Sequence, residues 1–96
     1  MVKQSSKRVA LPAVIDLDAI DGIRDTLSDA LEEGPVVVEA SAVERVSTNA
    51  LLLLVSAAET ARRHQFDFAI EAPSAAMKTA IERLGLGAQF SGMMRQ

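Results

Sequence analysis

The chain has 96 residues, of which 49% are hydrophobic and 24% charged, and its net charge at pH 7 is −3. This composition is typical of one globular domain with a modest core, and the absence of cysteine excludes disulfides, thiol catalysis and thiolate metal sites. No Lys/Arg cluster suited to nucleic acid is present, and no apolar run approaches the roughly 20 residues that span a bilayer, so we expect neither nucleic-acid binding nor membrane insertion and place the protein in the cytoplasm.

The first half of the chain alternates between strand and helix patterns. The apolar segment 9–15 contains Pro12, which cannot donate to a ladder, so this segment is either an edge strand or an irregular lead-in. Asp16 and Asp18 are candidate caps of the helix that follows, and Gly34–Pro35 ends that helix. Its apolar face consists of Ile20, Ile23, Leu27, Ala30 and Leu31.

Two further strand–helix units follow. The β-branched run 36–38 predicts a central strand covered on both faces, and a helix is predicted from residue 48 to about 64. Apolar and polar residues then alternate over 66–71, as in a strand with one wetter face. A last helix opens at 73–74 and ends at Gly85, after which the chain folds back onto the core. The apolar residues of this closing part are Met77, Ala80, Ile81, Leu84, Leu86 and Phe90.

The order strand, helix, strand, helix, strand, helix implies parallel crossover connections. The sequence therefore predicts a single α/β domain over residues 1–96, in which a small mixed or parallel sheet has helices packed on it. Residues 1–6 are predicted to be a flexible leader of this domain.

The turn before the second helix carries the polar residues that best suit a functional site. Functional groups collect at the carboxyl ends of parallel strands, and the free amides of a helix N-terminus favour an anion. Ser47 or Thr48 is either the N-cap of this helix, worth about 1 kcal/mol, or a phosphoacceptor, and the two roles are compatible.

The second helix has four consecutive leucines, more than a one-sided core can accommodate. Steps of 100° per residue place one set on the core face: Leu51, Leu54, Val55, Ala58 and Ala61. Leu53 falls nearly opposite, in an outer stripe with Asn49, Ser56 and Thr60, and Leu52 lies between the two faces. Either Leu52 packs on a neighbouring helix and Leu53 is a singly exposed leucine, or the outer stripe is a partner surface.

Other residues do not combine into a catalytic or metal site. His64 is the only histidine and is expected to interact with the end of its helix. Glu39 ends a buried strand, yet no second acid, base or nucleophile is spaced to work with it. We therefore expect no enzyme activity, no metal and no cofactor.

Three segments together resemble the STAS family, which is named for sulfate transporters and anti-sigma factor antagonists. Residues 36–39 are similar to the family's strand, residues 47–51 occupy its motif, and residues 81–86 with Phe90 are similar to its closing helix and Gly-Leu turn. The resemblance covers nearly the whole chain and implies that Thr48 matches the hydroxyl residue that is phosphorylated in anti-sigma factor antagonists. Ser47 replaces the Asp of the motif, Asn49 stands where a small residue is usual, and Ala50 replaces the Gly.

Within the family, the chain looks most like the small stand-alone STAS proteins of bacterial chemotaxis gene clusters. This likeness implies a non-enzymatic regulator that binds a histidine-kinase-type ATPase, either a chemotaxis kinase or an anti-sigma kinase, and modulates phosphate signalling. The alternatives are a stabilising subunit of a lipid-transport ABC transporter ATPase and a small-molecule or nucleotide sensor. The expected partner-binding residues are Ser47, Thr48, Asn49, Leu52, Leu53, Ser56 and Thr60.

Overall fold

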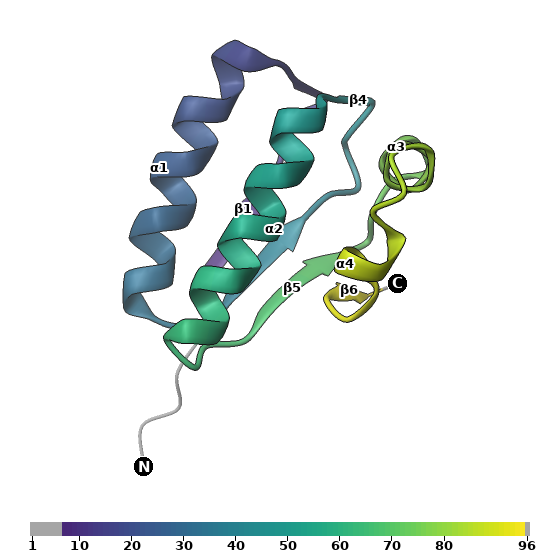
Figure 1. Cartoon of the computed structure of the whole chain (residues 1–96). Coiled ribbons are helices and arrows are strands. Elements are labelled where there is room, and N and C mark those ends of the chain that lie inside the picture. The colour runs from purple at the N-terminus through teal and green to yellow at the C-terminus, as the bar shows by residue number, and fades with distance from the viewer. Residues whose placement is uncertain (1–6, 96) are drawn as a thin grey trace.

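The computed structural model describes residues 7–95 and shows a sheet with helices packed against it (Figure 1). The sheet contains β1 (Lys7–Ala10), β3 (Val36–Glu39), β5 (Phe68–Glu71) and β6 (Met94–Arg95), in the order β1-β3-β5-β6. Every pairing in it is parallel. The predicted α/β class and the central position of the strand at 36–38 are confirmed. The predicted leader, residues 1–6, lies outside the described residues.

The first apolar segment forms two short strands instead of one. β1 is an edge strand, as expected for a segment followed by proline, and the chain beyond Pro12 continues as β2 (Val14–Ile15). β2 pairs in parallel with β4 (Arg45–Val46) in a separate two-stranded sheet. The strand predicted over 66–71 begins only at Phe68.

Within residues 7–95, four helices connect and flank the strands. α1 (Leu17–Glu33) and α2 (Thr48–Arg63) lie side by side against one face of the four-stranded sheet (Figure 1). α3 (Ala75–Arg83) and α4 (Gly87–Ser91) lie beyond β5. Their inward residues Met77, Ile81 and Phe90 are buried, so the predicted fold-back onto the core is confirmed. Leu84, predicted to join this apolar stripe, is 44% exposed because α3 ends at Arg83 and leaves it at the turn.

The central strand is buried on both faces, as predicted, although α1 and α2 pack on only one of them. Val36 and Val38 belong to the main core cluster beneath α1 and α2, whereas Val37 belongs to the opposite face and is outside that cluster. Val37 is nevertheless only 8% exposed, and its neighbour Ala69 on β5 is only 4% exposed. Water therefore has little access to the apolar side chains of this face. The Arg8 side chain crosses this face from β1 and reaches Glu71 on β5. Among residues 7–95, the structure has no helix long and apolar enough to cross a membrane.

Candidate functional site

The short β2–β4 ladder brings the first turns of α1 and α2 together. Its register pairs Ile15 with Val46, and the Ser47 N–H donates to the Ile15 carbonyl at 3.1 Å. Because a single residue separates each helix from the strand before it, the two N-termini lie at the same end of the molecule (Figure 1). The Asp16 carboxylate accepts a hydrogen bond from the Ala19 N–H at 3.1 Å and caps α1, as predicted.

Ser47 and Thr48 have different environments at the start of α2. Ser47 is the N-cap, since its Oγ accepts a hydrogen bond from the Ala50 N–H at 3.2 Å. Thr48 is the first helical residue and is exposed. Its hydroxyl makes no hydrogen bond within the described part of the chain. The capping role therefore belongs to Ser47, and the Thr48 hydroxyl is accessible from solvent.

The four leucines of α2 occupy three different environments. Leu51 and Leu54 are fully buried, as predicted, while Leu52 is 47% exposed. Leu53 is only partly exposed and packs against the core, where it shares a small apolar recess with Leu11, Ile15 and Ile23. The placement of Leu53 on the outer face is therefore wrong, and so is the alternative in which Leu52 packs on a neighbouring helix. α2 contacts both the sheet and α1, so its buried surface is wider than a one-sided stripe and includes Leu53.

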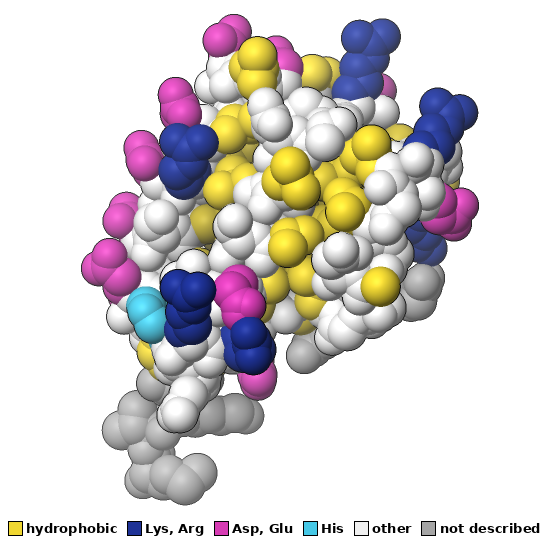
Figure 2. Space-filling model, in the orientation of Figure 1, with side chains coloured by type: hydrophobic (Ala, Val, Ile, Leu, Met, Phe, Trp, Pro, Cys, Tyr) yellow, Lys and Arg dark blue, Asp and Glu magenta, His cyan; other side chains and the backbone are white. Residues whose placement is uncertain are grey.

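A groove of about 670 Å³ runs between α1 and α2. Five of the seven expected partner-binding residues line it: Asn49, Leu52, Leu53, Ser56 and Thr60. Ser47 and Thr48 are not part of the lining but precede Asn49 at the N-terminus of α2. Figure 2 shows hydrophobic side chains recessed between the two helices and acidic side chains along the outer flank of α1.

The wall of the groove that α1 supplies was not anticipated from the sequence. It includes Leu17, which at 67% has the largest exposed fraction among the large hydrophobic residues at positions 7–95. It also includes Asp21 and Arg24, whose side chains are joined by a 3.1 Å ion pair. One signal was available: Leu17 directly follows the cap Asp16 and is absent from the predicted apolar face of α1.

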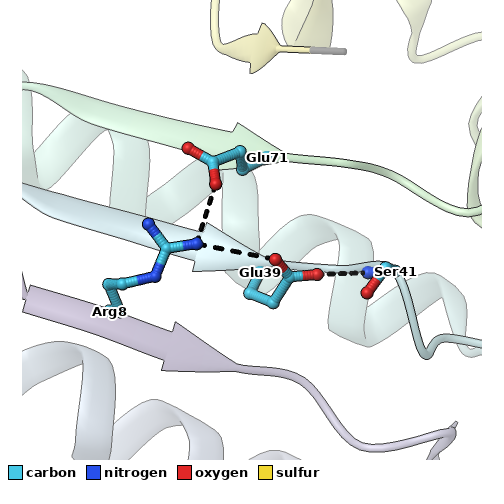
Figure 3. A network of polar contacts seen from close by, with 4 residues as sticks. All are labelled: Arg8, Glu39, Ser41 and Glu71. Atoms are coloured by element: carbon cyan, nitrogen blue, oxygen red, sulfur yellow. Dashed lines mark hydrogen bonds and ion pairs between the residues drawn. The ribbon is translucent and has the colours of Figure 1, made fainter.

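A second polar cluster lies on the sheet face that α1 and α2 leave open. The guanidinium of Arg8 on β1 donates to Glu71 on β5 at 2.7 Å and lies 3.5 Å from Glu39 on β3 (Figure 3). The pKa of Arg8 is raised, chiefly by its hydrogen bond to Glu71. The pKa of Glu39 is lowered, chiefly by hydrogen bonds from Ser41 and secondarily by the charge of Arg8. The cluster joins three strands and leaves neither glutamate without a partner, which suits a structural role.

Metal-binding geometry is absent from the part of the chain that the structure describes, where no three His, Cys, Asp or Glu residues cluster suitably. His64 occupies the C-cap position of α2. Its Nδ1 is 3.4 Å from the Leu31 carbonyl oxygen, and its ring makes an edge contact with Phe66.

Comparison with known proteins agrees with this architecture. Two solved structures of the anti-sigma factor antagonist SpoIIAA are similar over 100% of this chain. The unphosphorylated form has 16% sequence identity and a TM-score of 0.76, and the match covers 84% of its chain. The phosphorylated form, described as a Bacillus cell fate determinant, has 17% identity and a TM-score of 0.72, with 87% of its chain covered. No curated protein matches the sequence. The family model described as "Mlab, STAS domain" matches residues 2–95, and the chain therefore belongs to the STAS domain family.

Proposed function

We propose that this STAS domain is a non-enzymatic cytoplasmic regulator that binds a histidine-kinase-type ATPase and modulates phosphate signalling. The observation that carries the proposal is the gathering of Asn49, Leu52, Leu53, Ser56 and Thr60 in one groove beside the start of α2. Leu52 and Leu17 both line this groove and remain largely exposed, so partner binding can bury apolar surface that folding leaves in water.

Thr48 is the proposed phosphoacceptor of this surface. It is exposed, its hydroxyl is not used for capping, and it directly precedes the groove residue Asn49. A phosphate there adds close to two negative charges at the N-terminus of α2, where the free amides favour an anion. The fold tolerates that charge, whereas a partner packed against the same turn is repelled or displaced. The likeness in fold to a protein known in phosphorylated and unphosphorylated forms supports this assignment.

The first experiment is affinity capture of the tagged protein from a lysate of its native cells, with identification of the partners by mass spectrometry. A histidine kinase or an anti-sigma kinase recovered in stoichiometric amount is the expected result. Stoichiometric recovery of a transporter ATPase would contradict the signalling role and favour the alternative of a stabilising transporter subunit.

The second experiment measures the affinity of the captured kinase for matched variants. Leu52→Glu is expected to weaken binding by roughly tenfold or more, because it places a charge in the apolar contact. Leu84→Glu is the control, since Leu84 is similarly exposed but does not line the groove. Equal affinities of the two variants would overturn the proposed surface.

Thr48 is tested in the same assay. Thr48→Glu is expected to weaken kinase binding, and Thr48→Ala is expected to bind as the unmodified protein does. An acidic residue in the first turn of α2 favours the helix, so loss of binding by Thr48→Glu is not explained by unfolding. If both variants bind equally well, the hydroxyl has no regulatory role.

A further inference from the structure

The two walls of the groove differ in charge. The α2 wall is neutral and polar at Asn49, Ser56 and Thr60. The helix that forms the other wall, α1, has one basic residue, Arg24, and the acidic residues Asp18, Asp21, Asp25, Asp29, Glu32 and Glu33.

Few of these acidic residues are neutralised within the protein. Asp21 is paired with Arg24, and Glu33 is paired with Lys7 at 3.1 Å. The other four acidic residues of α1 form no ion pair within residues 7–95, and all four are exposed. Figure 2 shows the acidic side chains as a row along the outer flank of α1. These residues form an acidic border beside the groove, and its unpaired carboxylates can form ion pairs with Lys or Arg residues of another protein.

The groove itself is elongated and apolar along its base. Its lining extends along α1 from Leu17 to Glu32, a stretch of roughly 22 Å at 1.5 Å per residue. Leu17 and Leu52 stand at its rim, and Leu53 is part of the lining between them and the core. The backbone groups of both walls are satisfied within helices, so the groove offers no free edge to an added strand. An elongated apolar groove between helices suits an amphipathic helix.

We infer that the groove binds an amphipathic helix of the partner protein, with an apolar stripe against Leu17, Leu52 and Leu53 and with Lys or Arg residues facing α1. This inference rests on the proposed function, because it specifies the chemistry of the partner segment. The acidic border also attracts a basic segment from a distance and so raises the association rate constant. This increase is expected to diminish as the salt concentration rises.

The inference is tested with a defined probe, a synthetic helical peptide of about 15 residues, long enough to run beside the groove. The probe has Leu at helical spacing and Lys at its other positions, and the matched peptide has Glu in place of every Lys. Amide chemical shifts of the full chain are followed by NMR, and affinity is measured by fluorescence anisotropy. The Lys peptide is expected to shift resonances of residues 17–32 and 49–64 and to bind roughly tenfold or more tightly than the Glu peptide.

Two pairs of variants distinguish binding in the groove from nonspecific electrostatic attraction of the Lys peptide to an acidic protein. Glu32→Lys, on the groove, is expected to weaken binding of the Lys peptide more than Glu82→Lys, on α3. Lysine near the end of α1 is compatible with the helix dipole, so Glu32→Lys is expected to fold. Leu17→Gln is likewise expected to weaken binding, and Leu84→Gln is not.

Several outcomes overturn the inference. They are equal affinity for the Lys and Glu peptides, shifts centred outside the groove, and equal effects of Glu32→Lys and Glu82→Lys. A dimer in sedimentation that Leu17→Gln abolishes would assign the groove to a second copy of this chain. If the captured kinase needs Leu52 but ignores Glu32→Lys, this inference fails while the proposed function stands. If the captured partner is not a kinase, the proposed function fails while the peptide result stands.

Discussion

Arg8 and Glu71 are 63 positions apart in the sequence, yet their side chains form a 2.7 Å hydrogen bond that spans the intervening strand β3 (Figure 3). In the register of the sheet, Arg8 is opposite Val37, so the arginine side chain must pass over this valine to reach β5. The aliphatic part of an arginine covers apolar surface while its guanidinium stays in water. This explains why Val37 and Ala69 are shielded on a sheet face that has no helix over it.

The ionisation of Glu39 is expected to make the free energy of unfolding of the protein depend on pH. Its pKa is lowered by hydrogen bonds from Ser41 and by the charge of Arg8, so the ionised carboxylate is the form that the fold favours. The resulting stabilisation is present above the ordinary glutamate value of 4.5 and is lost as the pH falls through the lowered pKa. Glu39→Gln is expected to lower the free energy of unfolding at pH 7, and the difference from the natural protein is expected to shrink in acid. Urea denaturation at pH 7 and pH 3 measures this; a difference that stays constant with pH would contradict it.

Ser47 and Thr48 are expected to differ in their effect on stability. Ser47→Ala removes the cap of α2 and is expected to lower the free energy of unfolding by about 1 kcal/mol. Thr48→Ala removes an exposed hydroxyl that has no hydrogen bond in the described structure, and a change within about 0.5 kcal/mol is expected. Urea denaturation of both variants checks the assignment. Equal losses would mean that the two hydroxyls share the capping role.

The leucine run offers a graded test of the packing of α2. Leu51→Ala and Leu54→Ala each leave a cavity in the core and are expected to cost about 2–5 kcal/mol. Leu52→Ala is expected to cost no more than about 0.5 kcal/mol, because that side chain is already largely in water. The loss of unfolding free energy for Leu53→Ala is expected to lie between those of the buried and the exposed leucines. A larger loss at Leu52 than at Leu53 on thermal or urea unfolding would contradict the observed orientation of the helix.

Two exposed glycines are expected to respond to alanine in opposite directions. Gly22 lies inside α1 with open space where a Cβ would be placed, so Gly22→Ala is expected to stabilise the protein by about 1 kcal/mol. Gly85 follows α3 at a φ of +69°, a left-handed conformation that costs a residue with a Cβ roughly 1–2 kcal/mol. Gly85→Ala is therefore expected to destabilise. Thermal unfolding of the two variants provides the comparison, and a shift of both in the same direction would contradict it.

Local sequence signals were sufficient to predict the three longer helices and the strands β3 and β5, but not the separate short elements β2, β4, α4 and β6. The apolar periodicity of residues 20–31, with the stop at Gly34–Pro35, predicted α1, and the valine run predicted the central strand. These features depend on residues close together in the chain, where backbone preferences and the spacing of apolar side chains act directly. The turn at residues 47–49 was also recognisable, because a polar segment between a buried strand and a helix is a local pattern.

Only the tertiary structure decided how these elements face one another. The same helical spacing is compatible with Leu52 or Leu53 pointing outward, and the choice depends on where α1 packs against α2. The contribution of Leu17 to the groove depends on the two-residue pairing of β2 with β4, and the shielding of Val37 depends on a contact across three strands. The sequence alone therefore determined the longer helices and the central strands, since nearby residues set them. The site needed the tertiary structure, because its two walls and its exposed leucines are brought together only by contacts between segments distant in the chain.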